Sequence, residues 1–227
     1  MEKRTLILGA YNTAVYGWTL AQCKITKGQQ VQTFVQVPGR YAPLDASTYL
    51  TEGQPYYDSA SLDAVLECSA GDRNHREQLI SDLINYVDGR SLTIIHPDHP
   101  GHYLVGRIQA EVDYSDLAHC SVILSAVCEP WLWATQETQV TLAGSTTERT
   151  ISITLTGRLT VVPKVTVTGE ITITFGSSTW TLSAGEYFLP DLFLTPSEAP
   201  GTPRVYTVSY KGTGRAVLSY REAVLAA

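Results

Sequence analysis

LISDLINYVDGRSLTIIHPDHPGHYLVGRIQAEVD, residues 79–113, is the stretch of sequence that decides the fold. Its first part places apolar residues at steps of three and four, the spacing of one helix face. These residues are Leu79, Ile80, Leu83, Ile84 and Val87. Gly89 follows, and a glycine there can adopt the left-handed conformation that ends a helix. The remainder predicts strands at 92–95 and 103–112, joined by a loop rich in histidine and proline.

Alternating apolar residues predict further strands on both sides of this helix. They lie at 31–37, 62–68 and 120–128, and each is expected to bury one face. The helix is expected to be capped by Asp72 or by Asn74, because Asn74 and Glu77 have the spacing of a capping box. The first half is therefore predicted to be an α+β unit dominated by antiparallel sheet.

The second half is predicted to contain only β structure. Apolar residues alternate with serine and threonine at 151–155 and again at 171–175. Glycine-containing turns recur at spacings typical of a β-sandwich, and the prolines of 196–203 indicate a loop. The chain of 227 residues suits two small domains. A polar stretch after Trp133 marks the boundary, so we expect domains at 1–135 and 136–227.

Composition and charge restrict the function. Hydrophobic residues make up 44% of the chain and charged residues 17%, which is ordinary for a globular core. The formal net charge of -6 offers no basic surface for phosphates, so sequence-specific nucleic-acid binding is not expected. No apolar run resembles a signal peptide or a membrane span. We expect free, mostly buried thiols, as suits a reducing cytoplasm, at Cys23, Cys68, Cys120 and Cys128.

Short motifs follow one another in a particular order between residues 31 and 133. Before the strand at 62–68 they are Pro38-Gly39-Arg40, Leu44-Asp45, Leu50-Thr51-Glu52-Gly53 and Tyr56-Tyr57. After the helix they are Asp88-Gly89-Arg90, the loop Pro97-Asp98-His99-Pro100-Gly101-His102-Tyr103, Val105-Gly106-Arg107-Ile108 and Cys128-Glu129-Pro130-Trp131. Together they resemble the N-terminal domain of the distal tail proteins of long-tailed bacteriophages. The chain departs from that pattern at Asp58-Ser59-Ala60-Ser61, where the family often has an arginine.

This resemblance implies a mainly β protein: a tail-tube-like β-barrel or sandwich domain with one helix, then a galectin-like β-sandwich. It implies a homohexameric ring at the distal end of the virion tail, assembled in the host cytoplasm. The ring would join the tail tube protein to tail-tip or tail-associated proteins and leave a channel for DNA. Receptor-binding or side-fibre proteins would attach at its periphery. The resemblance implies a structural protein that is not an enzyme and has no cofactor and no membrane partner.

The matched motifs also predict where subunits meet. The segment 38–57 is long, polar and without periodicity, so we expect it to lie against neighbouring subunits or the tube. The predicted interface residues are Pro38, Gly39, Arg40, Leu44, Asp45, Leu50, Tyr56, Tyr57, Arg90 and Arg107. For the three arginines, bridging a carboxylate or capping a carbonyl within the fold is an equal alternative.

A histidine-rich loop raises the question of a metal site. His96, His99 and His102, with Asp98 among them, place four potential metal ligands within seven residues. A tight zinc site normally also recruits a ligand from a distant part of the chain. The pattern therefore favours a polar hairpin loop at a subunit contact over a metal site.

Catalytic and sugar-binding signals are weaker. The chain contains no Gly-x-Ser-x-Gly elbow, no Walker A sequence and no catalytic-cysteine signature. Trp180 could stack on a sugar ring, although it shares a strand face with Leu182 and is expected to serve the sandwich core. A carbohydrate-binding adhesion module on a viral or cell-surface appendage is therefore the alternative function. A tube-type ring protein is the third, but it would not require so large a second domain.

Overall fold

The computed structural model describes residues 4–49, 55–68, 72–114, 120–199 and 201–226. Contacts divide the chain into two compact units, one of Met1–Leu132 with Leu225–Ala227 and one of Trp133–Val224. The chain therefore leaves the first unit and comes back to it at its C-terminus. No pattern in the sequence indicated this return. No helix among the described residues is long and apolar enough to cross a membrane.

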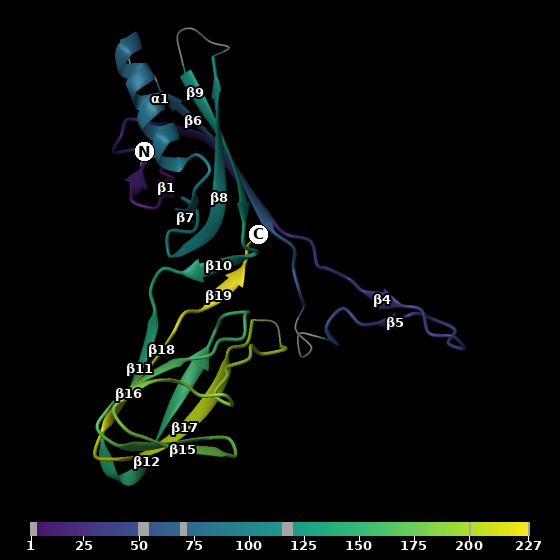
Figure 1. The fold of residues 1–227 in the computed structure, drawn as a ribbon, viewed down its shortest axis with the longest axis vertical. Coiled ribbons are helices and arrows are strands. Elements are labelled where there is room, and N and C mark those ends of the chain that lie inside the picture. Colours follow the sequence, from purple (N-terminus) through teal and green to yellow (C-terminus); the bar gives the residue numbers. More distant parts are fainter. Residues whose placement is uncertain (1–3, 50–54, 69–71, 115–119, 200, 227) are drawn as a thin grey trace. The chain divides into compact units, whose positions relative to one another are not determined.

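The described residues form one helix and many strands (Figure 1). The helix is α1 (Arg73–Val87). The strands of the first unit are β1 (Ile7–Leu8), β2 (Tyr11–Asn12), β3 (Thr19–Thr26), β4 (Phe34–Val35), β5 (Leu44–Asp45), β6 (Ala60–Cys68), β7 (Ser91–Ile95), β8 (His102–Asp113) and β9 (Cys120–Cys128). The chain passes between the units in β10 (Trp131–Ala134) and β19 (Ala223–Leu225), which pair with each other. The second unit contains β11 (Thr138–Leu142), β12 (Ser145–Leu155), β13 (Lys164–Thr168), β14 (Ile171–Phe175), β15 (Ser178–Leu182), β16 (Gly185–Phe188), β17 (Arg204–Gly212) and β18 (Arg215–Tyr220).

The main sheet of the first unit is curled. Its strand order is β2-β1-β7-β8-β9-β6-β3, and residues 13–18 alone join the two end strands, β2 and β3. Laid flat, seven strands would put these ends about 29 Å apart, at roughly 4.8 Å per strand. The connection spans at most about 24 Å when fully extended. The sheet must therefore bend toward itself, and β2 and β3 do not pair in the part of the chain that the structure describes.

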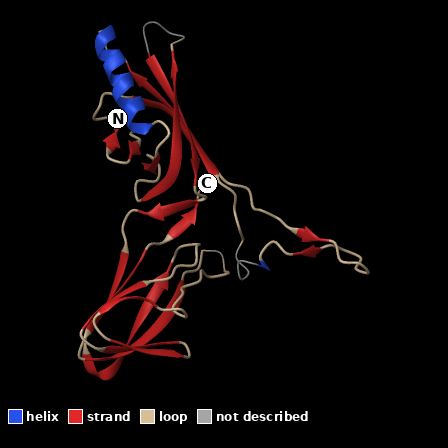
Figure 2. Ribbon diagram, in the orientation of Figure 1, coloured by secondary structure: helices blue, strands red, loops and turns tan. Residues whose placement is uncertain are grey.

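The core of the first unit lies between the concave sheet and α1 (Figure 2). Side chains of β6, β8 and β9 alternate between buried and exposed, so each strand contributes one face, as predicted. The helix buries Ile80, Leu83 and Val87, which belong to the predicted stripe. Gly106 is required in this layer because a Cβ there would lie 2.4 Å from the Cys128 sulfur. The four cysteines are free, and three of them are buried, as expected.

The ends of the helix follow the sequence signals in part. The Asp72 carboxylate accepts a hydrogen bond from the Asn74 N–H, so Asp72 is the N-cap and Asn74 lies inside the helix. The proposed capping box of Asn74 and Glu77 is therefore wrong. Gly89 follows the helix with a φ of +70°, and its N–H donates to the Ile108 carbonyl at 2.8 Å. This left-handed residue turns the chain from α1 into β7, as expected.

The second unit is a β-sandwich of two four-stranded sheets. One sheet has the order β11-β18-β13-β16 and the other β12-β17-β14-β15. Buried side chains of both sheets form one hydrophobic core, centred on residues such as Val165, Ile171 and Leu218. The predicted loop at 196–203 precedes β17, whose first residue is Arg204. The expected fold class, mainly β with one helix and a C-terminal sandwich, is confirmed.

The predicted half-buried strand at 31–37 is wrong. Only Phe34–Val35 is a strand there, and it pairs with Leu44–Asp45 alone. Val31, Val35 and Val37 remain 39%, 44% and 37% exposed. Alternation marks a half-buried strand only where a second layer covers one face, and in the part of the chain that the structure describes this two-stranded ribbon has none.

Candidate assembly surface

Residues 29–58 form an excursion that we call the arm. Its base is closed by three backbone links between its two limbs: the Gln30–Tyr57 bridge, the Val31 N–H to Tyr56 carbonyl at 2.9 Å, and the Asp58 N–H to Gln29 carbonyl at 2.8 Å. A Cβ on Gly28 would lie 2.0 Å from the Asp58 carbonyl oxygen. The limbs therefore approach so closely at the base that residue 28 must be glycine.

Aromatic contacts anchor the same base. The Tyr57 ring meets the edge of Trp131, with 5.9 Å between ring centroids, and the Lys27 ammonium lies 5.4 Å from the Tyr57 ring centroid. Tyr57 thereby links the arm to the strand that closes the sheet domain. The base of the arm is therefore held by both backbone and ring contacts.

The middle of the arm is held by short polar contacts. Val35 pairs with Leu44, and the Thr33 N–H donates to the Ser47 hydroxyl at 2.8 Å. The Asp45 carboxylate accepts from the Ser47 N–H at 2.9 Å. The side-chain and backbone hydrogen bonds of Ser47 lower the pKa of Asp45. These contacts keep the ribbon together but bury almost nothing.

The tip of the arm is a tight turn. The Arg40 N–H donates to the Val37 carbonyl at 3.1 Å, and Gly39 has a φ of +83°. Proline followed by a left-handed glycine is the sequence of a type II turn, which explains Pro38-Gly39. Arg40 is exposed, and the Tyr41 side chain beside it is fully exposed.

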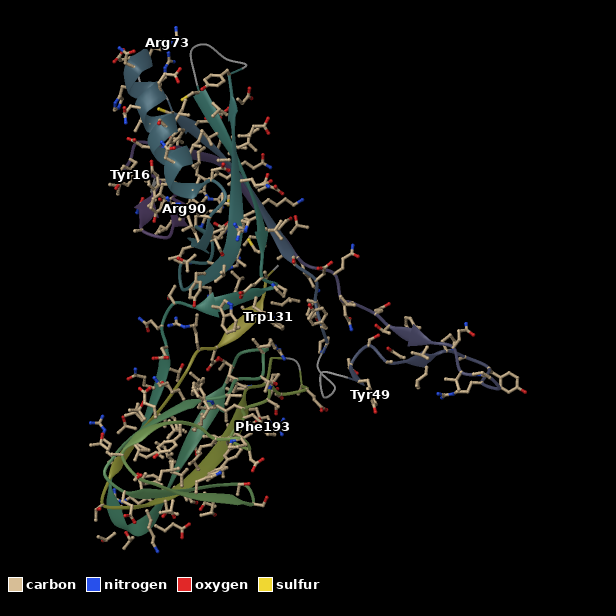
Figure 3. The ribbon with its side chains drawn as sticks, viewed as in Figure 1. Tyr16, Tyr49, Arg73, Arg90, Trp131 and Phe193 are labelled. Atoms are coloured by element: carbon tan, nitrogen blue, oxygen red, sulfur yellow. The ribbon has the colours of Figure 1, made fainter. Side chains whose placement is uncertain are left out.

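Large apolar side chains along the arm are open to solvent. Tyr49, labelled in Figure 3, is 84% exposed on the second limb. The other exposed members are Val31, Phe34, Val35, Val37, Tyr41, Leu44 and Tyr56. A run of exposed apolar residues on one segment is typical of a surface that a partner covers.

The predicted interface residues fall into two groups. Seven lie together on the arm: Pro38, Gly39, Arg40, Leu44, Asp45, Tyr56 and Tyr57. Arg90 and Arg107 lie on the sheet domain instead, where the Arg107 guanidinium donates to the Gly89 carbonyl at 2.6 Å and that of Arg90 lies 5.9 Å from the Tyr86 ring centroid. Leu50 lies outside the described residues. Contact of any of them with a neighbour stays a prediction.

A hollow of about 330 Å³ lies at the base of the arm. Tyr56, Val127 and Arg107 form part of its wall, and Ser59, Ser91 and Gly106 are among the small residues that leave it open. Asp58 and Glu129 also line it. The sequence did not single out these two carboxylates as a pair, because only the tertiary fold brings residues 58 and 129 together.

The sheet domain also has a long free edge. Among the described residues, the eight-residue strand β3 pairs with β6 on one side only, through seven of its residues, with a bulge between Leu20 and Gln22. Its other side presents backbone N–H and C=O groups that a further strand could meet.

The histidine loop does not have the arrangement of a metal site. His96 is 5% exposed, and its Nδ1 accepts from the Asp98 N–H at 3.2 Å. Burial lowers the pKa of His96, against the opposing effect of the Asp98 carboxylate. The Asp98 carboxylate is bound by the Arg4 guanidinium at 2.5 Å. Within the described residues, no group of three His, Cys, Asp or Glu side chains could hold a metal ion.

Trp180 does not form an exposed platform. It is partly buried and packs against the hydrophobic core of the second unit. Its opposite residue across the strand pair is Ile173, which is fully buried. The sequence expectation that Trp180 serves the sandwich core is confirmed.

The fold and the arm define a class of protein: a curled sheet with one helix, an extended arm, and a β-sandwich inserted before the C-terminus. The structure is similar to the Dit protein of phage SPP1, described as a paradigm of the hub adsorption apparatus in phages that infect Gram-positive bacteria. The TM-score is 0.63 at 12% sequence identity, over 96% of this chain and 98% of that one. The resemblance to distal tail proteins is thus confirmed at the level of the fold. No protein-family model and no curated protein sequence matches the chain.

Proposed function

We propose that this chain is a structural protein of a phage tail tip, a hub subunit that forms a hexameric ring at the distal end of the tail. In this proposal the sheet domains make the ring and the arms reach neighbouring subunits. The ring joins the tail tube protein to tail-tip proteins and leaves a channel for DNA. Receptor-binding or side-fibre proteins attach to it, and assembly takes place in the host cytoplasm. In this proposal the protein acts as a structural connector and has no catalytic centre and no cofactor.

The arm is the observation that carries this proposal. Among its described residues it exposes eight large apolar side chains, and the contacts that hold those residues are at its base and in a few polar hydrogen bonds. An isolated two-stranded ribbon is marginal in water, so a segment of this kind gains its stability from a partner. The free edge of β3 adds a second unsatisfied surface to the same domain. In a closed ring of identical subunits, a neighbour can cover both the arm and the β3 edge of every subunit. No subunit is then left with an uncovered interface to which further copies could add.

Native mass spectrometry and negative-stain electron microscopy of the full chain test the proposal. We expect six-fold rings with a central opening. A variant in which a Gly-Ser pair replaces residues 33–46 should unfold at the same temperature, because the removed side chains are exposed, but should no longer form rings. Mixing the intact chain with the adjacent tail-tip protein should cap one face of the ring. A chain that stays monomeric at high concentration and with that protein, or a shortened variant that still forms rings, contradicts the proposal.

A further inference from the structure

Two of the four cysteines face each other across a strand pair. Cys68 is the last residue of β6, Cys120 is the first residue of β9, and the antiparallel register places them directly opposite. Opposite residues point to the same face of a sheet. Here that face is the core, because Cys68 is 2% and Cys120 is 6% exposed. The Cys120 thiol donates to the Cys68 carbonyl at 3.7 Å, so the two residues meet within one buried layer.

The other two cysteines have a different kind of neighbour. Cys23 lies opposite Ala64 on β6. Cys128 lies opposite Ala60 on β6 and opposite Gly106 on β8. All four cysteines belong to the described residues and are free thiols. The strand register therefore singles out one pair among them.

The spacing of this pair suits a disulfide. Directly opposite residues of antiparallel strands have Cα atoms about 4.5 or 5.5 Å apart, depending on their place in the hydrogen-bond pattern. Disulfides have Cα separations of roughly 4.4–6.8 Å, so either place permits the bond with little movement of the strands. Cys68 and Cys120 are 52 positions apart in the chain. The bond would close a loop that contains α1, β7 and β8, and closing a loop of this length restricts the unfolded chain strongly.

The surroundings make the reduced pair slow to react. Burial is the main cause that raises the pKa of Cys120; the charge and side-chain hydrogen bond of Cys68 raise it further, and the Arg76 guanidinium opposes them. A thiol with a raised pKa forms little of the thiolate that attacks a disulfide. Both residues lie at strand ends, where local opening admits a small reagent more readily than in the middle of a strand. We therefore expect oxidation to be slow and to need no global unfolding.

We infer that Cys68 and Cys120 form a disulfide when the chain meets a small-molecule disulfide such as oxidised glutathione. The thiolate of one cysteine attacks that reagent, forms a mixed disulfide and releases one glutathione. The second cysteine, as its thiolate, then attacks the protein-bound sulfur and releases the other glutathione. Two electrons pass from the protein to the reagent, and the two thiol protons end on the two glutathione molecules released.

The bond would staple the sheet domain outside the cell. Disulfides persist in oxidising surroundings and are rare in a reducing cytoplasm. A chain assembled in the host cytoplasm would therefore carry the two thiols and would gain the bond after release. This timing rests on the proposed function, whereas the bond itself depends only on the register of β6 and β9.

Oxidation of the full-length chain tests the bond. The chain is purified with a reductant and then kept in equal concentrations of reduced and oxidised glutathione at about pH 8.5, where more thiolate is present. Its mass should fall by about 2 Da, the two hydrogen atoms lost. A non-reducing digest should contain the peptides of Cys68 and Cys120 joined together. By calorimetry, the first unit should unfold roughly 5–10 °C higher, and reduction should reverse this shift.

Two matched variants separate the bond from packing. Cys120→Ala removes the bond, so its unfolding temperature should be the same in oxidant and in reductant. Cys128→Ala deletes another buried thiol and should keep the full difference. Each variant is compared with itself, so the packing lost with the sulfur cancels. If Cys120→Ala fails to fold, the digest of the unmodified chain still decides.

The result can fail in ways that are distinct from failure of the ring. A folded, unmodified chain that keeps all four thiols after this treatment overturns the inference, and so does a digest in which a different pair is joined. Both measurements are independent of assembly. A chain that forms the bond but remains monomeric supports the inference and contradicts the ring alone.

Discussion

The hairpin β8–β9 and the arm hairpin β4–β5 are both antiparallel, and strand β9 and the arm segment 31–37 both have alternating apolar residues, yet only the residues of β9 are buried. In β9 every second side chain, from Cys120 to Cys128, is buried. On the arm, Val31, Val35 and Val37 remain exposed. The difference is the second layer: α1 and the curled sheet cover one face of β9, whereas no described residue covers the apolar side chains of the ribbon. The same alternation thus serves a core in one place and, we propose, an intermolecular contact in the other.

Truncating one apolar residue in each hairpin should give the largest contrast. Leu124 in β9 is 1% exposed, so Leu124→Ala should lower the free energy of unfolding by about 3 kcal/mol. Leu44 on the arm is 43% exposed, so Leu44→Ala should change it by less than about 0.5 kcal/mol. Urea denaturation of the two variants at low protein concentration measures both. Similar losses would show that the arm packs on its own chain, contrary to the comparison.

The base of the arm should be the next most sensitive position. In Gly28→Ala, the new Cβ cannot lie 2.0 Å from the Asp58 carbonyl, so the links between the two limbs must open. We expect a loss of about 1–2 kcal/mol, as for overpacking elsewhere. Hydrogen exchange should become faster at Val31 and Asp58, while β8 and β9 stay protected. Gly101→Ala is the matched control because a Cβ there meets nothing within 4 Å. Unchanged exchange at Val31 would mean that the base is not closed in solution.

Acid should affect the sheet domain and spare the arm. The pKa of His96 is lowered below its ordinary value of 6.5, chiefly by burial, so the folded chain holds this proton less well than the unfolded chain. The contribution of neutral His96 to the free energy of unfolding is therefore complete above about pH 6.5. It is lost as the pH falls through that value toward the lower pKa of the folded chain. The loss is about 1.4 kcal/mol for each tenfold difference in proton affinity.

Thermal unfolding between pH 7.5 and 5 measures this effect. His96→Asn keeps an acceptor for the Asp98 N–H but does not titrate, so its stability should vary less with pH over that range. The groups that act on His96 are Asp98 and the Cys23 backbone, which raise its pKa, and His99 and Arg4, which lower it. His99→Asn is the control and should keep the pH dependence. Equal slopes for the original chain and His96→Asn would remove His96 as the cause.

The smallest effect is expected in the middle of the arm. Asp45→Ala removes the acceptor for the Ser47 N–H, in a segment that buries nothing. The unfolding temperature should not change measurably, and only the amide of Ser47 should exchange faster by NMR. The lowered pKa of Asp45 means that the same contact in the original chain should persist down to about pH 4 and weaken below it. A global loss of stability would indicate that the arm supports the fold.

Local signals were sufficient for most elements and insufficient for the arm. The stripe of Ile80, Leu83 and Val87 predicted α1, and Gly89 predicted its end, because both depend on neighbours within a few residues. Alternation at 31–37 was misleading, since burial depends on what covers a strand and not on the strand itself. The motifs Pro38-Gly39-Arg40 and Tyr56-Tyr57 lie on the arm, but the sequence did not show that they belong to one exposed segment, and their contact with a partner stays a prediction.

Sequence alone determined the elements whose causes are local: the helix and its glycine end, the long strands, the polar loop at 196–203 and the Pro-Gly turn at the arm tip. Only the tertiary structure decided that the sheet curls, that the last residues return to the first unit, and that Asp58 and Glu129 share one hollow. The physical reason is that periodicity and turn chemistry act over a few residues. Burial and charge balance depend instead on groups that are far apart in the chain and meet only after folding.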